Sequence, residues 1–373
     1  MTIENILEEI ETKIDKVHTQ SLDLSFNELL DMFKNHELDI SPDYQRLFRW
    51  TVGARSRFIE SLILEMPVPP IYVVETDDGV YQLIDGLQRF SSYLHLRGEL
   101  VAEHMNPPIK KGDALELADC DIVKGLNGLT FESLPMALKI KLKRAFVRVE
   151  VVRKGSDNKL KYHMFKRLNT GGEPLTEQQI RNCTIRMLNP QFNDFISQMS
   201  QNADFQNCIK NISDVQRYGS YDIELVLRYF ALKNYRSEFK HDVADFMTEY
   251  MEGVSDGSLY FDYESNKINF EKVFFILNKA HKNKIFARIG KENNLQNNFN
   301  IYHFESITMG IQDIIDLIDI KEDGNIQKVK DSVIKLKNDE NFKAETTGGG
   351  KNSTGLLRKR IELAQQFFLG VIQ

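Results

Sequence analysis

Residues 71–89 read IYVVETDDGVYQLIDGLQR, and this stretch decides the fold of the first half of the chain. Two apolar runs, 71–75 and 80–84, flank the tight-turn sequence Asp77-Asp-Gly79, so we expect a β-hairpin. The second run passes through one glycine directly into residues 87–97, whose apolar positions have helical spacing. The hairpin and the helix behind it predict a mixed α/β region.

The flanking sequence adds further elements of both kinds. Ser25, with Glu28 three residues later, is a capping-box pattern and predicts a helix over Ser25–Asn35. Alternating valines in Ala145–Val152 predict a strand with one buried face. Additional helices are expected at Thr2–Val17, Arg55–Glu65, Phe131–Arg144 and Leu160–Leu168, and near Glu177 after its cap Thr176.

Proline usage separates two parts of the chain. All nine prolines lie in the first 190 residues, and proline is excluded from helix interiors. We therefore predict an α+β fold, with a small mixed sheet in an N-terminal domain at residues 1–190 and an all-helical domain at 191–373. Helices of the second domain are expected at Phe192–Ser200, Asp222–Asn234, Asp242–Glu252, Phe270–Asn283, Phe304–Ile318, Ile326–Lys337 and Leu356–Val371.

Composition excludes several classes of protein. Hydrophobic residues make up 42% of the 373 residues, which is enough for a substantial core and too much for a disordered chain. No apolar run approaches the roughly 18 residues of a membrane span, and the acidic start Met1–Ile10 is unlike a signal peptide. The three cysteines lack C-x-x-C spacing, which favours reduced thiols in a cytoplasmic protein. A net charge of −6 argues against nonspecific coating of nucleic acid.

The corner Asp85-Gly-Leu-Gln-Arg89 is the strongest local signal for chemistry. A helix that starts directly after a strand presents free backbone N–H groups and the positive end of its dipole, which favour an anion such as phosphate. Gly86 would let a ligand approach the backbone, and Gln88 and Arg89 add side-chain donors. Asp85 would lie beside the anion, where a carboxylate is unfavourable unless it binds a metal or orients water. The alternative is an ordinary β-turn-α corner in which Asp85 caps the helix.

Two further segments carry polar and aromatic side chains. Seven arginine or aromatic residues between Tyr44 and Arg57 can bind phosphate and stack on a base. The alternative there is a packed tryptophan among solvated arginines. Residues 165–182 read FKRLNTGGEPLTEQQIRN, which by itself is typical of a helix–helix connection with a C-terminal glycine.

Positive charge is concentrated in one stretch. Lys139–Arg167 holds eleven Lys or Arg against two acidic residues, a balance of +9 in an acidic protein. Such a stretch indicates a surface that faces nucleic acid or nucleotide, and we select Lys141, Lys143 and Arg144 as nucleic-acid-binding residues. The alternative is a solvated helix face.

Several catalytic signatures do not occur in the sequence. It has no G-x-x-x-x-G-K-[ST], so the chain is not a P-loop NTPase. Its eight histidines never fall in H-E-x-x-H or paired-ligand spacing, and there is no G-x-S-x-G. No resident metal site is therefore predicted.

Taken together, four segments resemble a family. They have the order and spacing of the ParB/sulfiredoxin-like domains at the N-terminus of GmrSD-type proteins, which include subunits of modification-dependent restriction enzymes and phosphorothioate-sensing antiphage proteins. The segments are Tyr44-Gln-Arg…Trp50, Pro67-Val-Pro-Pro-Ile-Tyr72, Ile84-Asp-Gly-Leu-Gln-Arg89 and Phe165-Lys-Arg-Leu-Asn-Thr-Gly-Gly172. The resemblance covers about residues 20–190 and extends more weakly to Arg217…Phe230 and Arg358-Lys-Arg-Ile361.

The resemblance implies a nucleotide site and its chemistry. The implied nucleotide-binding residues are Gly86, Gln88 and Arg89 with Asp85, with Gln45 and Arg46 beside them, and we add Asn169 of the fourth segment. Asp85, the only carboxylate inside the motif, is the expected catalytic residue, and the expected cofactors are an NTP and Mg²⁺. Two departures matter. Leu87 stands where the family usually has glutamine, and no His-rich nuclease segment follows residue 190, so we expect no intrinsic nuclease activity.

The sequence is compatible with two functions. The first is a nucleotide-binding, NTP-hydrolysing subunit of a bacterial DNA-restriction or antiphage system, acting with a separately encoded nuclease or toxin. The second is a noncatalytic module that senses nucleotide or modified DNA, or neutralises a partner toxin. DNA is a further expected partner, and a membrane is not. Hydrolysis needs a metal or base near the γ-phosphate, so the role of Asp85 separates the two.

Overall fold

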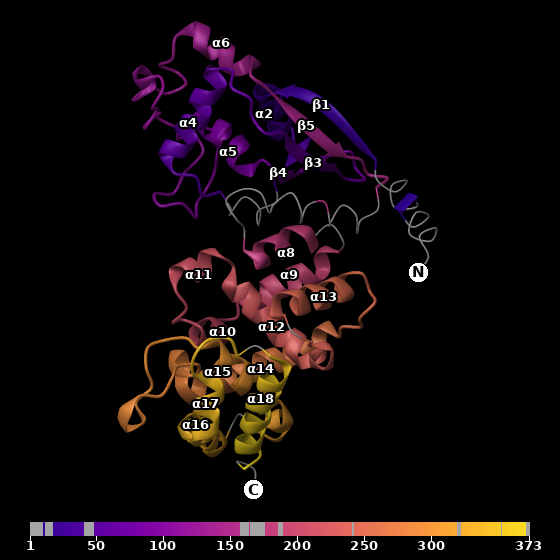
Figure 1. The fold of residues 1–373 in the computed structure, drawn as a ribbon, viewed down its shortest axis with the longest axis vertical. Helices are drawn as coiled ribbons and strands as arrows, with labels where there is room; N and C mark the ends of the chain where they lie inside the picture. Colours follow the sequence, from indigo (N-terminus) through magenta and orange to yellow (C-terminus); the bar gives the residue numbers. More distant parts are fainter. Residues whose placement is uncertain are drawn as a thin grey trace. The chain divides into compact units, whose positions relative to one another are not determined.

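The computed structural model describes residues 10–11, 18–40, 48–156, 164, 176–185, 189–240, 242–318, 322–351 and 353–370. It divides into two compact units, Met1–Pro174 and Leu175–Gln373 (Figure 1). The predicted helices Thr2–Val17 and Leu160–Leu168 lie outside the described residues, apart from residues 10, 11 and 164.

A five-stranded mixed sheet forms the centre of the first unit. Antiparallel pairing joins β3 to β4 and β1 to β5, whereas β3 pairs with β5 and β2 with β4 in parallel. The order is β1-β5-β3-β4-β2, so the small mixed sheet predicted from the sequence is confirmed. The strands are β1 (Thr19–Ser25), β2 (Leu38–Asp39), β3 (Ile71–Glu75), β4 (Tyr81–Asp85) and β5 (Phe146–Val152).

The β3–β4 hairpin forms as its turn sequence predicts. The amide of Thr76 donates to the carbonyl of Val80 (2.8 Å), and Gly79 between them has a φ of +83°, a conformation that favours glycine. On β5, the alternating valines are buried, as the sequence pattern predicts: Val147, Val149 and Val151.

Four α-helices lie among the described residues of the first unit: α2 (Phe26–Lys34), α4 (Val52–Ile63), α5 (Leu87–Leu96) and α6 (Met136–Arg144). The ring of Phe26 in α2 contacts Phe58 of α4 and Tyr93 of α5, with centroids 5.8 and 5.3 Å apart, so these three helices share one core. The Ser25 cap of α2 is confirmed, because its Oγ accepts from the amide of Glu28 (3.0 Å).

Some elements differ from the expectation. Helix α6 begins at Met136 rather than Phe131, because a turn precedes Pro135, which lacks an N–H and occupies the N-cap position. The sequence pattern did not predict β1 or β2. Only Leu22 and Leu24 are apolar in β1, an edge strand, and β2 is two residues long.

The second unit contains no strand among its described residues, only an isolated bridge between Ile289 and Leu295. This confirms a helical C-terminal part. The division between the units falls before α8, while the domain boundary at residue 190 stays a prediction. The α-helices are α8 (Glu177–Ile185), α9 (Pro190–Ser200), α10 (Ala203–Cys208), α11 (Asp214–Tyr218), α12 (Tyr221–Asn234), α13 (Val243–Ser255), α14 (Tyr263–His281), α15 (Ile301–Gly310), α16 (Asp323–Asn338), α17 (Glu340–Thr346) and α18 (Thr354–Leu369).

Two buried arginines meet one buried glutamate in the second unit. Arg360 of α18 contacts Oε2 of Glu305 in α15 through Nη2, and Arg228 of α12 places Nε 3.3 Å from Oε1 of the same glutamate. None of the three residues is more than 7% exposed. Arg228 and Arg360 come from the two segments to which we expected a weaker family resemblance to extend, and that extension stays a prediction.

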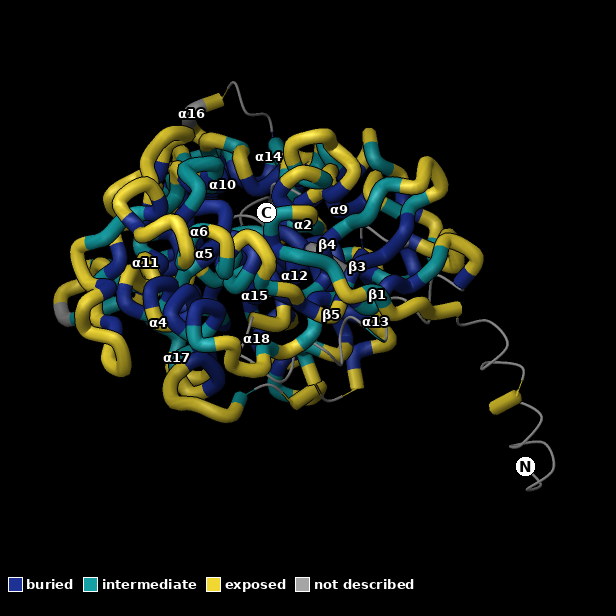
Figure 2. The backbone as a smooth tube through the Cα atoms, turned by 90° about the horizontal axis from the view of Figure 1, so that it is seen from above, coloured by how far each residue is buried: buried dark blue, intermediate teal, exposed yellow. Residues whose placement is uncertain are grey.

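Burial follows the two units. Buried and exposed residues alternate along the helices and strands of both units, as the dark blue and yellow stretches of the tube in Figure 2 show. None of the described helices is long and apolar enough to cross a membrane.

Candidate functional site

Asp85–Arg89 form a strand-to-helix corner at the end of β4. Gly86 joins the two elements with a φ of +101°, in the left-handed region. A Cβ on Gly86 would lie 2.8 Å from Cγ1 of Ile71, so the corner requires glycine both for its conformation and for space. The Ile71 side chain occupies the space in which the sequence led us to expect a close ligand approach.

The first turn of α5 has no side-chain cap. Gly86 occupies its N-cap position, whereas a serine, threonine, asparagine or aspartate side chain caps α2, α4, α9 and α13. The first amides of α5 therefore keep their capacity to bind an anion at the positive end of the helix dipole. Asp85 does not cap this helix, so that alternative from the sequence is wrong.

The guanidinium of Arg89 is held at the same corner. Its Nη2 donates to the carbonyl of Pro70 (2.9 Å) and to Oδ2 of Asp85 (3.1 Å), with which it forms an ion pair. Nη2 thereby uses both of its hydrogens. The Nε of Arg89 is buried and has no hydrogen-bond partner among the described residues. Nε and Nη1 are the donors that remain for a ligand.

Gln88 accepts hydrogen bonds from the backbone of the segment before α4. Its Oε1 accepts from the backbone amides of Arg49 (3.0 Å) and Trp50 (3.1 Å). The structure thus fixes the end of the Tyr44–Trp50 segment on the first turn of α5, which joins two of the motifs. Three predicted nucleotide-binding residues lie outside the described residues: Gln45, Arg46 and Asn169.

Arg55 and Trp50 have protein partners. Arg55 donates from Nε to the carbonyl of Trp50 and from Nη1 to Nδ1 of His95, both at 2.8 Å. Burial lowers the pKa of Arg55, and burial with the charge of Arg55 lowers the pKa of His95 to about 4. The Trp50 ring packs edge-on against Phe58 at 5.9 Å. The packed-tryptophan alternative therefore holds for Trp50, while Arg55 is buried rather than solvated.

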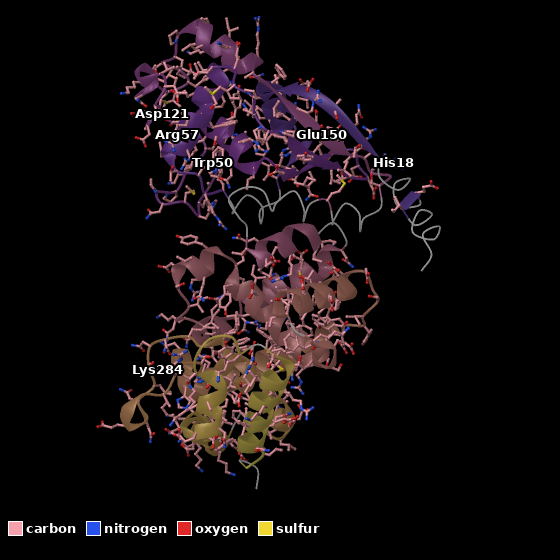
Figure 3. All side chains as sticks on the ribbon, in the orientation of Figure 1. His18, Trp50, Arg57, Asp121, Glu150 and Lys284 are labelled. Carbon is pink, nitrogen blue, oxygen red and sulfur yellow. The ribbon has the colours of Figure 1, made fainter. Side chains whose placement is uncertain are left out.

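A row of polar side chains crosses the sheet beside Asp85. The register places Asp85 opposite Tyr72, Tyr72 beside Glu150, and Glu150 opposite Ser21. Directly paired residues share one face of a sheet, and Ser21 Oγ donates to Glu150 Oε2 at 2.6 Å (Glu150 is labelled in Figure 3). Sequence reasoning did not select Tyr72 or Glu150. The only available signal was that Tyr72 ends the proline-rich motif.

Comparison with known proteins adds an independent observation. Residues 27–186 match the family model of the GmrSD restriction endonuclease N-terminal domain. This segment is similar to that domain. The match includes the β3–β4 hairpin, the Asp85–Arg89 corner and β5, and it confirms the family resemblance of the motifs. No curated protein and no solved structure is significantly similar to the chain.

The basic stretch Lys139–Arg167 is partly paired. Lys141 Nζ lies 3.2 Å from Oε1 of Glu65, whereas Lys143 and Arg144 are exposed. Residues 157–163 and 165–167 of the stretch lie outside the described residues. Of the three predicted nucleic-acid-binding residues, Lys141 is therefore the one already engaged by a carboxylate.

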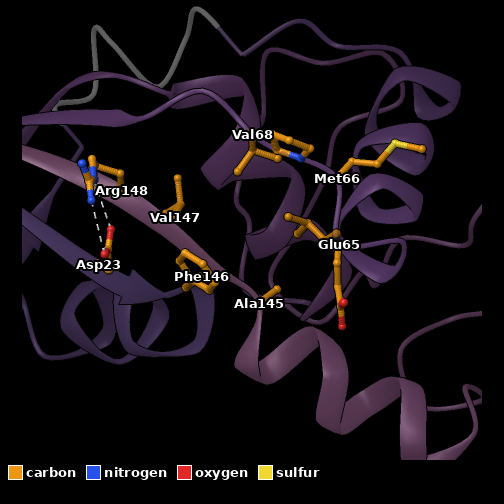
Figure 4. A pocket seen from close by; sticks show the side chains of 10 residues that line it. Asp23, Glu65, Met66, Val68, Ala145, Phe146, Val147 and Arg148 are labelled. Atoms are coloured by element: carbon orange, nitrogen blue, oxygen red, sulfur yellow. Dashed lines mark hydrogen bonds and ion pairs between the residues drawn. The ribbon is translucent and has the colours of Figure 1, made fainter.

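A groove of about 430 Å³ lies between the segment after α4 and the start of β5 (Figure 4). Phe146 and Met66 line it and are 67% and 41% exposed. The ion pair between Arg148 and Asp23, with Nε and Oδ1 3.2 Å apart, also lines it. None of the residues Asp85–Arg89 does, so the groove is distinct from the corner.

Metal-binding capacity is limited where the structure describes the chain. No group of three or more His, Cys, Asp or Glu residues there could hold a metal ion. Cys120 and Cys208 are buried free thiols, and burial raises the pKa of both. A metal at the corner would need ligands from the nucleotide in addition to Asp85.

Proposed function

We propose that the GmrSD N-terminal domain of this chain binds an NTP at the β4–α5 corner, and that nucleotide binding and hydrolysis control a separately encoded nuclease or toxin. The family match supports a component of a restriction or antiphage system. The binding of a nucleotide and the existence of a separate effector chain go beyond this match and are our proposal.

The uncapped first turn of α5 beside Arg89 is the observation that carries the nucleotide site. Among the described residues, no side chain caps these amides and none bonds the buried Nε of Arg89, and the two groups lie within one helical turn of each other. An unsatisfied buried donor is costly, and a phosphate oxygen is the acceptor that both groups prefer. The Arg89 side chain is 16% exposed, which leaves it within reach of a bound anion.

Asp85 is the candidate catalytic residue. Its side chain is 32% exposed, and Oδ2 is bonded to Arg89. Proteins usually hold Mg²⁺ through one or two carboxylates together with substrate phosphates, so one exposed carboxylate beside a phosphate site fits this ion. Asp85 would hold Mg²⁺ with the nucleotide, and the ion would neutralise charge on the phosphates. Asp85 itself would keep Arg89 oriented toward the same point.

We also propose that a second surface, at the end of α6, contacts DNA. Lys143 and Arg144 at the end of α6 are exposed cations. Every charged residue in the last turn of α6 is a lysine or an arginine. Lys141 can contribute only if its ion pair with Glu65 opens. Binding through these residues should weaken as the salt concentration rises.

A noncatalytic partner-binding module is the second candidate function. The exposed apolar residues around the groove favour it, since contiguous exposed apolar surface often marks a protein interface. Phe146 and Met66, which line the groove, are 67% and 41% exposed. In this case the protein would bind a nucleotide or a toxin without turnover.

One experiment separates these functions. We would titrate the full chain with ATP, GTP, CTP and UTP in the presence of Mg²⁺ by calorimetry, and measure phosphate release in the same samples. Binding with release is the expected result. Binding without release would favour the noncatalytic module, and no binding of any of the four nucleotides would contradict the nucleotide site.

A further inference from the structure

Side chains from three parts of the first unit hold the backbone of Phe48–Trp50. Gln88 of α5 accepts from the amides of Arg49 and Trp50. Arg55 of α4 donates to the carbonyl of Trp50, and Nε2 of His104 donates to the carbonyl of Phe48 at 3.0 Å. We call these contacts the clamp.

The clamp uses the acceptor capacity of Gln88 fully. A carbonyl oxygen has two lone pairs, and Oε1 of Gln88 receives two N–H groups, at 3.0 and 3.1 Å. The partner amides lie 38 and 39 positions away in the sequence, so the contact ties together two distant segments. An oxygen used in this way is not available to a metal ion or to a hydroxyl group of a ligand.

The surroundings of the clamp keep this geometry. The Phe48 side chain is fully buried, with the guanidinium of Arg55 5.1 Å from the centre of its ring. Trp50 packs against Phe58 on α4. Four backbone contacts, the buried Phe48 ring and the half-buried Trp50 ring therefore fix the segment against α4 and α5.

We infer that Gln88 is a positioning residue, whose Oε1 fixes Phe48–Trp50 on the first turn of α5. This inference rests on the proposed nucleotide site only for its effect on nucleotide binding. The loss of the clamp would release the chain beside Arg89, because Arg49 and Trp50 contact the residue directly before Arg89. Gln88 would thus affect the nucleotide through the shape of the site.

Trp50 allows a direct test, because it is the only tryptophan in the chain. We would compare the emission maximum and acrylamide quenching of Trp50 in the full-length protein with those of Gln88→Leu, Gln88→Glu and His104→Leu, and titrate each with the four NTPs. Gln20→Leu is the matched control, since Gln20 is an exposed glutamine on β1. Circular dichroism would verify that each variant folds.

A positioning role predicts a common pattern. Gln88→Leu and His104→Leu should both shift Trp50 emission to the red, raise its quenching and weaken nucleotide binding, the former by about tenfold for two lost hydrogen bonds. Gln88→Glu keeps an acceptor for both amides, so Trp50 should stay as in the unmodified protein. Any loss of affinity in Gln88→Glu should come from charge repulsion and disappear at high salt.

The opposite pattern would overturn the inference. If Gln88→Leu weakens nucleotide binding while Trp50 and the His104→Leu affinity stay unchanged, Gln88 is a ligand. If Gln88→Leu changes neither Trp50 nor affinity, the clamp positions nothing. If the unmodified protein binds no NTP, the proposed function fails, and the Trp50 measurement alone still decides whether Gln88 fixes the segment.

Discussion

Arg89 and Asp85 are joined by an ion pair in which Nη2 and Oδ2 are 3.1 Å apart, one helical turn from each other across the start of α5. The same nitrogen donates to the carbonyl of Pro70 directly before β3. The guanidinium is therefore tied to both strands of the hairpin. At the proposed nucleotide site, this arrangement would orient Arg89 before the nucleotide binds and so reduce the entropy lost on binding.

Replacing Arg89 tests the phosphate site. Arg89→Ala should cost about 2–4 kcal/mol of nucleotide binding, the range for losing a charge-assisted contact in a partly desolvated site. Arg89→Lys should recover only part, because an ammonium lacks the planar fork. Calorimetry with each NTP measures this. The matched control is Arg148→Ala, since Arg148 also pairs with an aspartate, Asp23, but lies on β5. Equal affinity of Arg89→Ala and the unmodified protein would contradict the site.

Replacing Asp85 separates turnover from binding. Asp85→Asn keeps an acceptor for Arg89 and removes the charge, so we expect near-normal nucleotide affinity with phosphate release reduced at least about 100-fold. Phosphate release at saturating NTP and Mg²⁺ measures the effect. Asp23→Asn, in the other arginine–aspartate pair, should leave release unchanged. Full turnover in Asp85→Asn would exclude Asp85 from catalysis.

Acid should destabilise the first unit through His95. Its pKa is lowered to about 4, whereas an unfolded histidine titrates near 6.5. The unfolded chain thus binds the proton more readily between these values, and stability falls as the pH falls from 6.5 to 4. Between pH 7 and 5 the loss should be about 2 kcal/mol for this residue.

Urea unfolding at pH 7 and at pH 5 measures this loss. His95→Asn presents an oxygen to Arg55 where Nδ1 stood and cannot gain a proton, so it should remove about 2 kcal/mol of the pH dependence. Buried His303, whose pKa is lowered to about 3, should give the second unit a similar dependence that His95→Asn leaves in place. Equal slopes in His95→Asn and the unmodified protein would contradict the assignment.

Glu305 should be essential for the stability of the second unit. Glu305→Gln leaves the buried guanidinium groups of Arg228 and Arg360 without a countercharge, which should cost about 3–5 kcal/mol. Chemical denaturation of the full chain measures the change. Glu362→Gln is the control, because Glu362 pairs with Arg358 at the surface and should cost at most about 1 kcal/mol. Similar values for the two variants would show that the buried triad contributes little.

Local sequence signals predicted the elements that depend on neighbouring residues. The Ser25 cap, the Asp77–Gly79 turn and the alternating valines of β5 each act over a few positions, and each is confirmed. Local patterns also predicted that the chain passes from a strand through Gly86 directly into a helix. They did not show that Ile71 would fill the space beside it, because that contact joins two strands.

Features that depend on long-range contacts could not be predicted in this way. Sequence reasoning selected Gln88 for nucleotide binding but did not show that its oxygen accepts from amides 38 and 39 positions away. It expected Arg55 to bind phosphate or to be solvated, yet a histidine 40 positions away accepts from this buried side chain. The short helices α10, α11 and α17 span at most seven residues, too few for a clear period of apolar positions.

The first strand lies outside the family match, which begins at residue 27, yet all seven of its residues pair with β5. A fragment trimmed to residues 27–186 would expose the full hydrogen-bonding edge of β5, whose alternate positions are buried valines. Such an unprotected edge invites pairing between molecules and aggregation. A recombinant first unit should therefore start before Thr19, so that β1 can protect the sheet from self-association.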